Sequence, residues 1–256
     1  PKVISGYTNN CLKVVKIIYN FFVRRTVAVD KIEEAELSKL LENLYRAVNI
    51  GLVNEMKIIC EKLNINIFNT INAAATKNFG FQKFMPGPGL GGHCIPIDPF
   101  YLSWVSKKKG YDPKFIKLAG IINSKIPHWT INQVIKKLKK KNIKILLLGI
   151  SYKKDVDDDR ESPSYEFMKI LRNKKIKFDY HDPYFPKIRK GRNVKENKSS
   201  INLSKNELMK YDATILLTDH NFFDYKLIAK NSKFVFDTRG RYKKVNLDNY
   251  KNIIFC

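Results

Sequence analysis

Apolar residues recur at helical spacing along a stretch that begins at Lys31 and runs to about Leu63. Three glutamates near its start favour a helix N-terminus, because negative charge there is stabilised by the helix dipole. The sequence therefore predicts one long helix over this stretch. The apolar positions that define its pattern are Leu37, Leu40, Leu41, Leu44, Val48, Leu52 and Met56.

Two further segments show helical patterns before the character of the chain changes. Residues 64–77 predict a short helix, and residues 100–141 predict one or two longer helices. We expect Pro113 and Pro127 to interrupt the latter segment, because proline lacks a backbone N–H and crowds the preceding turn.

The pattern changes near residue 142, where short, continuously apolar runs begin to alternate with helical segments. Such runs predict buried strands, and their alternation with helices predicts a parallel sheet in a doubly wound α/β domain. The polar segment 187–200 is expected to be an exposed loop. We expect strands over residues 144–149, 176–180, 213–218 and 233–237, and a helix over residues 164–173.

The chain therefore divides into three parts, and its fold class is α/β. Residues 1–30 contain an amphipathic stretch around Leu12 to Phe22 and a short apolar Val-Ala-Val run. An all-helical domain is expected over residues 31–141, and the doubly wound, Rossmann-like domain over residues 142–256.

Composition narrows the class of protein. The chain has 256 residues, of which 44% are hydrophobic, enough for one or two cores. Its apolar runs are too short to span a bilayer and it shows no signal-peptide pattern, so we expect no membrane partner. The cysteines have no paired spacing and the histidines no metal-ligand spacing, which predicts a cytoplasmic protein with reduced thiols and no metal site. The four cysteines are Cys11, Cys60, Cys94 and Cys256.

The formal net charge of +24 raises the question of nucleic-acid binding. However, lysines are spread over every segment, and the densest runs, at residues 107–109 and 136–141, fall where helix ends and loops are expected. We therefore predict a solvated lysine surface and no nucleic-acid partner. A general attraction for phosphate-bearing ligands follows in either case.

Residues 86–99 read PGPGLGGHCIPIDP and are the most constrained segment of the chain. We call residues 86–94 the glycine loop. Glycine permits positive φ and close approach to a ligand, whereas each proline fixes φ, so this loop is sharply shaped around Cys94. Asp98 follows four residues later, which in a helical turn places it on the same face as Cys94. A tight turn with an incidental cysteine is the alternative to a catalytic loop built around a nucleophilic thiol.

The segment GGHCIPIDPFYLSW resembles the active-site segment of the UDP-glucose/GDP-mannose dehydrogenase family. Two other blocks are similar to the same family in the same order: residues 36–55 resemble its central helix, and residues 149–164 the opening of its C-terminal domain. The resemblance is nearest to the bacterial enzymes that oxidise C6 of UDP-N-acetylhexosamines or UDP-glucose in polysaccharide biosynthesis. It implies NAD as cofactor, a UDP-sugar as substrate, and a homodimer formed through the central helix.

The resemblance also implies catalytic roles for four residues. Cys94 matches the nucleophile that captures the sugar aldehyde and forms a thioester after a second oxidation. Asp98 matches the aspartate that positions the hydrolytic water. Lys39 and Asn43 share a helix face and match the lysine and asparagine that would stabilise an oxyanion, the lysine as a buried cation. Without the resemblance, Lys39 would be taken as a surface lysine.

Six residues match positions that contact substrate in the family, and each has a structural alternative. Aromatic residues before the glycine loop could hold the sugar or uracil, but they could equally pack in the core. Cations at strand ends suit a pyrophosphate, but they could equally be solvated. One of them matches an arginine that reaches the nucleotide from a neighbouring subunit, namely Arg239. The six residues are Phe79, Phe84, Gly91, Lys153, Arg160 and Arg239.

The family's NAD-binding domain precedes its central helix, and we find no counterpart of it here. The glycines at residues 87–92 are spaced GxGxGG and follow no predicted strand, so we do not assign them to a dinucleotide fingerprint. Residues 1–30 would then be the end of that domain or a linker, and the cofactor-binding residues are unknown. We therefore expect a chain that is inactive alone, and the alternative function is a truncated or split chain that binds UDP-sugar without catalysis.

Overall fold

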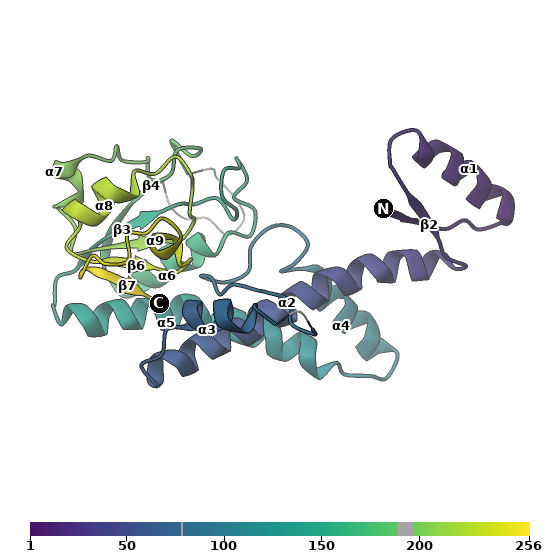
Figure 1. Cartoon of the computed structure of the whole chain (residues 1–256), viewed down its shortest axis with the longest axis horizontal. Helices are drawn as coiled ribbons and strands as arrows, with labels where there is room; N and C mark the ends of the chain where they lie inside the picture. The colour runs from purple at the N-terminus through teal and green to yellow at the C-terminus, as the bar shows by residue number, and fades with distance from the viewer. Residues whose placement is uncertain (78, 189–196) are drawn as a thin grey trace.

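The computed structural model describes residues 1–77, 79–188 and 197–256. A small N-terminal unit lies at one end, long helices run through the middle, and an α/β domain with a five-stranded sheet lies at the other end (Figure 1). This arrangement confirms the expected order of a helical domain followed by a Rossmann-like domain.

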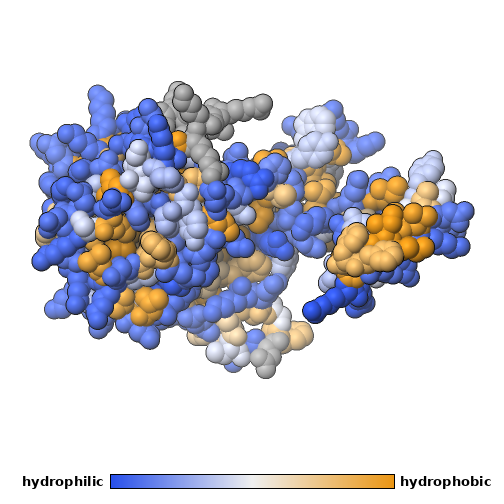
Figure 2. Space-filling view, turned by 90° about the horizontal axis from the view of Figure 1, so that it is seen from above, coloured by the Kyte–Doolittle hydropathy of each residue, from blue (hydrophilic) through white to orange (hydrophobic). Residues whose placement is uncertain are grey.

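The N-terminal unit is a β–α–β element. Strand β1 (Lys2–Ile4) pairs in parallel with β2 (Thr26–Ala28), and helix α1 (Asn9–Asn20) connects them. The amphipathic stretch of this region is therefore mostly α1, and Figure 2 shows apolar side chains gathered on the surface of the unit. The exposed apolar residues there are Tyr7, Val14, Ile17, Ile18, Phe21 and Phe22.

Four helices form the central part. The long helix expected from Lys31 is α2 (Ile32–Lys62). It is followed by α3 (Ile67–Ala74) and α4 (Asp98–Lys108). Helix α5 (Lys114–Leu138) packs along α2, and the two helices run beneath the C-terminal domain in Figure 1.

The two prolines of this part behave differently. Pro113 is the N-cap of α5, but Pro127 lies inside α5 and does not interrupt it, so the expected break at Pro127 is wrong. Pro127 is buried, and the packing of α5 outweighs the loss of one backbone hydrogen bond to the Asn123 carbonyl. That carbonyl lies beside Gly89 of the glycine loop.

Five parallel strands form the C-terminal sheet in the order β4-β3-β5-β6-β7. The four expected strands are present. Strand β7 and the helices α7, α8 and α9 were not expected, because elements of three to seven residues show too little periodicity. The strands are β3 (Lys144–Leu148), β4 (Lys177–His181), β5 (Ala213–Leu216), β6 (Val235–Asp237) and β7 (Ile253–Phe255). The helices are α6 (Pro163–Asn173), α7 (Lys205–Leu208), α8 (Tyr225–Asn231) and α9 (Arg241–Lys244).

Two sequence expectations concern the surface. The loop expected over residues 187–200 falls largely on residues 189–196, which lie outside the described residues; beside them, Lys187 and Ser199 form an antiparallel bridge. Within the described ranges, no helix combines the length and the apolar character needed to cross a membrane.

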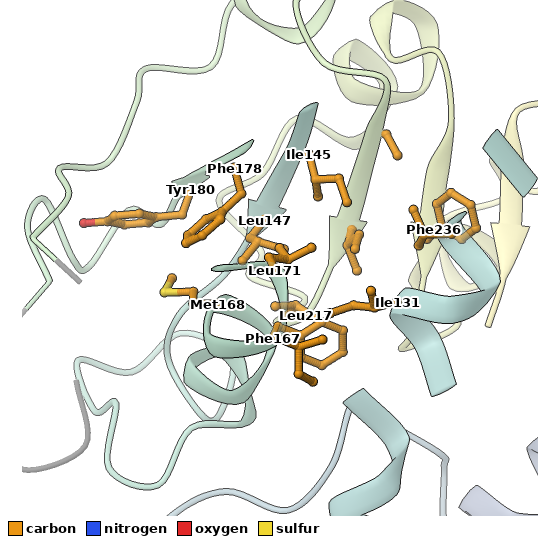
Figure 3. Close-up of a cluster of buried hydrophobic side chains, with 14 of the residues drawn as sticks. Ile131, Ile145, Leu147, Phe167, Met168, Leu171, Phe178, Tyr180, Leu217 and Phe236 are labelled. Carbon is orange, nitrogen blue, oxygen red and sulfur yellow. The ribbon is translucent and has the colours of Figure 1, made fainter. Parts of the chain in front are cut away.

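A hydrophobic core fills each face of the sheet. The core in Figure 3 packs side chains of β3 and β4 against Phe167 and Met168 of α6. Ile131 and Val134 of α5 belong to the same core and are fully buried. Helix α5 therefore packs on the sheet with its C-terminal half, while Ala119 in its N-terminal half lies against α2.

Gly149 ends β3 at the point where the chain turns toward the loop that carries Lys153. Its φ is +90°, and a Cβ there would lie 2.4 Å from the Cβ of Thr218, just after β5. Glycine is thus required both by conformation and by close approach. This contact holds together the carboxyl ends of two neighbouring strands.

We expect Gly149→Ala to lower the free energy of unfolding by about 3 kcal/mol, because the methyl group adds a steric overlap to the strain of positive φ. Gly110→Ala is the matched control: its φ is +89°, but nothing lies within 4 Å of the added Cβ. The control should therefore lose only about 1 kcal/mol. Urea unfolding monitored by circular dichroism compares the two, and equal losses would contradict the steric explanation.

Candidate active site

The glycine loop lies directly on the C-terminal domain. The Gly92 N–H donates to the Arg160 carbonyl over 3.0 Å. A Cβ on Gly91 would lie 2.8 Å from the Cβ of Tyr152 and 3.0 Å from the Cδ of Pro163. Gly92 is crowded by the same tyrosine and has a φ of +91°. Glycine at both positions is what allows the two domains to meet here.

Three of the four expected catalytic residues lie close together. The Cys94 carbonyl accepts from the Asp98 N–H over 2.8 Å, so the expected helical turn between them is present, and the Cys94 thiol is exposed. Asp98 is the first residue of α4, and its Oδ2 accepts from Nδ2 of Asn43 over 2.9 Å. Asn43 is buried on α2. An amide, a carboxylate and a thiol thus share one site where α2 meets the start of α4.

Lys39 is not the buried cation that the resemblance implied. Its side chain is 61% exposed, and Nζ forms an ion pair with Glu42 over 2.9 Å. This pair lowers the pKa of Glu42. Asp98 covers α2 at Asn43, whereas Lys39 lies one turn nearer the helix start, beyond that contact.

Arg160 reaches the site from the C-terminal domain. Its Nε and Nη2 bind both carboxylate oxygens of Asp158, over 3.0 Å and 2.6 Å at the shortest. Asp158 raises the pKa of Arg160, and the nearby Tyr152 and Cys94 add to this effect. Because its carbonyl accepts from the Gly92 N–H, Arg160 is bound to the glycine loop two residues before Cys94.

Lys153 and Arg239 both lie at the carboxyl edge of the sheet, where ligands bind in doubly wound domains. Lys153 follows β3 and is exposed. Arg239 follows β6 and is half-buried; its Nε donates to the Leu217 carbonyl over 2.7 Å, and burial lowers its pKa. A Cβ on Gly87 would lie only 2.9 Å from Nη1 of Arg239. Arg239 therefore touches the glycine loop of its own chain.

The two phenylalanines before the glycine loop differ in their surroundings. Phe84 packs against a core formed by α2 and α3, and its ring meets Tyr45 edge-on at 5.7 Å between centroids. Phe79 is 96% exposed. Core packing, the alternative that the sequence left open, thus describes Phe84, and substrate contact remains a prediction for both.

A buried hydrogen-bond network fixes the strand ends beneath Lys153, and the sequence did not point to it. Asp182 accepts from the backbone N–H groups of Ile150 and Ser151 over 2.5 and 3.1 Å, and its Oδ2 lies 3.2 Å from Nε2 of His220. Nδ1 of His220 accepts from the Asp155 N–H, so the ring proton lies on Nε2, facing the carboxylate. Burial alone would raise the pKa of Asp182, but these hydrogen bonds outweigh it and lower the pKa.

A second buried network was also missed, and the sequence did carry a signal for it. Small and amide residues recur along one face of α2 at Asn43, Ala47, Gly51 and Asn54, and all four are buried. Such residues at helical spacing indicate a face on which backbone or polar groups approach closely. Nδ2 of Asn54 donates to Oδ1 of Asn123 on α5 over 2.8 Å.

A cavity of about 430 Å³ lies elsewhere in the C-terminal domain. Its lining includes Lys144 and Lys177, at the starts of β3 and β4, and therefore lies at the amino edge of the sheet. This is the opposite edge from Lys153 and Arg239. The cavity is thus separate from the site around Cys94.

Comparisons with known proteins match both the helical part and the sheet domain of this chain. The central-domain profile of the UDP-glucose/GDP-mannose dehydrogenase family matches residues 33–125, and the UDP binding domain profile of that family matches residues 146–244. Together they include Cys94, Asn43, Asp98 and the carboxyl edge of the sheet.

Individual relatives are similar over most of this chain. A UDP-N-acetyl-D-mannosamine dehydrogenase of Methanococcus vannielii is 34% identical over 225 residues, which are 87% of this chain and 49% of that protein. An NDP-N-acetyl-D-galactosaminuronic acid dehydrogenase of Ralstonia nicotianae is 29% identical over 93% of this chain and 55% of its own. The solved UDP-D-ManNAc dehydrogenase of Pyrococcus horikoshii aligns with 99% of this chain and 58% of its own, with a TM-score of 0.80 and 27% identity. The chain spans about half the length of the curated relatives it matches.

We expect Asp182→Asn to lower the free energy of unfolding by about 2 kcal/mol at pH 7, because buried donors lose a carboxylate acceptor. The folded pKa of Asp182 lies below its usual value, so its stabilisation is present above about pH 4 and is lost as the pH falls through the lowered value. The variant should therefore lose less stability than the wild type between pH 4 and pH 2. Urea unfolding across that range tests this, with exposed Asp248→Asn as control; parallel curves would contradict it.

Proposed function

Since the chain belongs to the UDP-glucose/GDP-mannose dehydrogenase family, we propose that it carries the thiol and the UDP-sugar site of an NAD-dependent nucleotide-sugar 6-dehydrogenase. The reaction would oxidise C6 of a UDP-hexose or UDP-N-acetylhexosamine to the uronic acid, with two NAD+ reduced. Relatives named UDP-N-acetyl-D-mannosamine dehydrogenase favour an N-acetylated substrate. The observation that carries the proposal is the grouping of Cys94, Asp98 and Asn43 beside a domain whose sheet edge presents two cations.

Cys94 is the proposed nucleophile. Its exposed Sγ would add to the C6 aldehyde, forming a C–S bond while the carbonyl oxygen takes up negative charge. Asn43 has a second amide N–H beyond the one that binds Asp98, and this N–H suits that oxyanion. After oxidation to the thioester, water attacks the carbonyl carbon, the C–S bond breaks, and the thiol and the sugar carboxylate are released.

Asp98 and Lys39 are proposed to assist these two steps. The Asp98 carboxylate, held by Asn43, would orient the attacking water and accept a proton from it. Lys39 would reach the oxyanion by leaving Glu42. Such a solvent-exposed ion pair contributes little to stability, so the exchange costs little.

The UDP-sugar would lie between the sheet edge and the glycine loop. Arg239 and Lys153 suit the pyrophosphate as cations, and Arg160 extends this positive edge toward Cys94. Gly91 would bring loop backbone close to the sugar, and Phe79 and Phe84 would border it.

NAD would accept the hydride in both oxidations, but we assign no site for it among the described residues. The glycine run at residues 87–92 follows helix α3 and a loop, not a strand, so it lacks the setting of a dinucleotide fingerprint. For this reason binding of UDP-sugar without catalysis is the second candidate function of the chain on its own.

We further propose that two copies associate through α2. A stripe of large apolar residues runs along one face of this helix, and their spacing of three, four and seven residues keeps them together. Self-association would remove this stripe from water. The exposed residues are Leu37, Leu41, Tyr45, Leu52, Met56, Ile59 and Leu63.

Four free cysteines suit a reducing, cytoplasmic setting.

The first test combines calorimetric binding with NADH formation at 340 nm, using NAD+ and UDP-glucose, UDP-N-acetylglucosamine or UDP-N-acetylmannosamine. We expect one of these sugars to bind and no NADH to form, because the described residues lack a nucleotide fingerprint for NAD. Failure to bind any of the three would overturn the proposed function. NADH formation that disappears in Cys94→Ala would show instead that the chain is catalytically complete.

The second test concerns association. Leu52→Glu places a charge in the middle of the α2 stripe and should shift the protein from dimer toward monomer in light scattering at micromolar concentration. Arg46→Glu changes charge on another face of the same helix and should leave the mass unchanged. A wild-type protein that is monomeric under these conditions would refute the dimer.

A further inference from the structure

Near the start of the glycine loop, one helix binds both backbone polar groups of a single residue, Gly87. The Gly87 N–H donates to Oδ1 of Asn54 over 3.0 Å, and the Gly87 carbonyl accepts from Nζ of Lys57 over 3.3 Å. Both side chains come from α2, one turn apart, and both are at least 98% buried. The backbone of a single residue is thereby fixed on both sides, through two consecutive peptide groups, by two side chains of one rigid element.

The Asn54 amide cannot rotate to a different arrangement without losing hydrogen bonds. Its Nδ2 donates to Oδ1 of Asn123, which leaves Oδ1 of Asn54 facing Gly87. Nδ2 of Asn123 is itself bound to the carbonyls of Ala47 and Ala119, over 3.2 and 2.9 Å. The orientation of each amide is therefore set by the backbones of α2 and α5.

Lys57 brings a positive charge to a place that is costly for one. Its pKa is lowered to about 8, mainly by burial and also by the nearby Arg239, whereas Cys256 and Asp237 oppose the shift. Its Nζ also lies 5.1 Å from the centre of the Trp129 ring on α5. The Gly87 carbonyl and the aromatic face are the groups that compensate this buried ammonium.

Gly87 meets the C-terminal domain on its other side. A Cβ at this position would lie 2.9 Å from Nη1 of Arg239, so only glycine lets this guanidinium approach the loop. Arg239 is held in turn by the Leu217 carbonyl and by the Asp237 carboxylate, which accepts from its N–H. The backbone of Gly87 is thus enclosed between α2 and Arg239, seven residues before Cys94.

We infer that Asn54 and Lys57 are positioning residues that clamp the backbone of Gly87, and so fix the start of the Cys94 loop relative to Arg239. The clamp connects the central helix that carries Asn43 to the loop that carries the thiol and to a cation of the sheet edge. Its value for the reaction rests on the proposed function, but the clamp itself is a property of the chain without ligand.

The test is hydrogen exchange of the loop amides in the full chain without ligand, between pH 6.5 and pH 9. Protection factors of the Gly87 and Gly92 amides, corrected for intrinsic exchange, would be compared in wild type, Lys57→Met and Lys62→Met. Lys62 is the matched control, because it is an exposed lysine on the same helix. A buried amide of β3 serves as the internal reference.

At pH 6.5 we expect Lys57→Met to lower protection of the loop amides about fivefold, as for loss of one hydrogen bond, with no change in β3 or in Lys62→Met. This difference should shrink above about pH 8, because wild-type Lys57 then loses its charge. Loss of bulk packing alone would give a difference that is independent of pH. Protection within twofold of wild type at every pH, or a pH-independent difference, would overturn the clamp.

Two further measurements accompany this comparison. If Lys57→Met fails to fold, the wild-type protein alone tests the clamp. Protection of its loop amides should then fall relative to the β3 amide as the pH rises through 8, and a constant ratio of the two protection factors would refute the clamp. UDP binding is measured separately on the same samples. Absence of UDP binding would defeat the proposed function and leave the exchange result standing.

Discussion

The absence of side chains at Gly87, Gly91 and Gly92 is the constraint on which the rest of the structure depends. At each position a Cβ would lie within 3.0 Å of an atom of the C-terminal domain. The two domains therefore meet through backbone, with little room for adjustment. This closeness brings the backbone of Arg160 and the side chain of Arg239 against the glycine loop, although these residues come from widely separated parts of the chain.

Polar groups buried around this contact set its orientation. Hydrophobic burial stabilises each core but is not directional, whereas an amide bound at both ends has one arrangement. The Asn54–Asn123 pair and the Asp182–His220 pair serve in this way, on the helical and the sheet side of the loop respectively. The Asn54–Asn123 pair orients the start of the glycine loop, and the Asp182–His220 pair orients the chain that follows β3.

Much of the fold could be predicted from sequence, because long helices and buried strands have their own periodicity. Helix α2 was predicted to within a residue at each end, and the helical turn from Cys94 to Asp98 follows from spacing. The exposure of Lys39 agrees with what its residue type alone indicates, whereas the buried cation implied by the resemblance would require a segment that covers α2 at that position. The partners of Asn54 and His220 are likewise tertiary contacts, 69 and 38 residues away, to which no local pattern points. At Pro127 the opposite occurs: the local rule that proline interrupts a helix gives a wrong prediction, because the packing of α5 outweighs it.

Helix α5 belongs to two cores. Ala119 and Asn123 lie against α2, while Ile131 and Val134 are embedded beneath the sheet, and the helix is continuous between them. The domain boundary near residue 142 is therefore not a hinge, because one continuous helix packs against elements of both domains. A displacement of α2 would therefore be transmitted through α5 to the sheet. The surface proposed for association of two copies and the sheet edge proposed for the nucleotide are thus connected by one continuous helix.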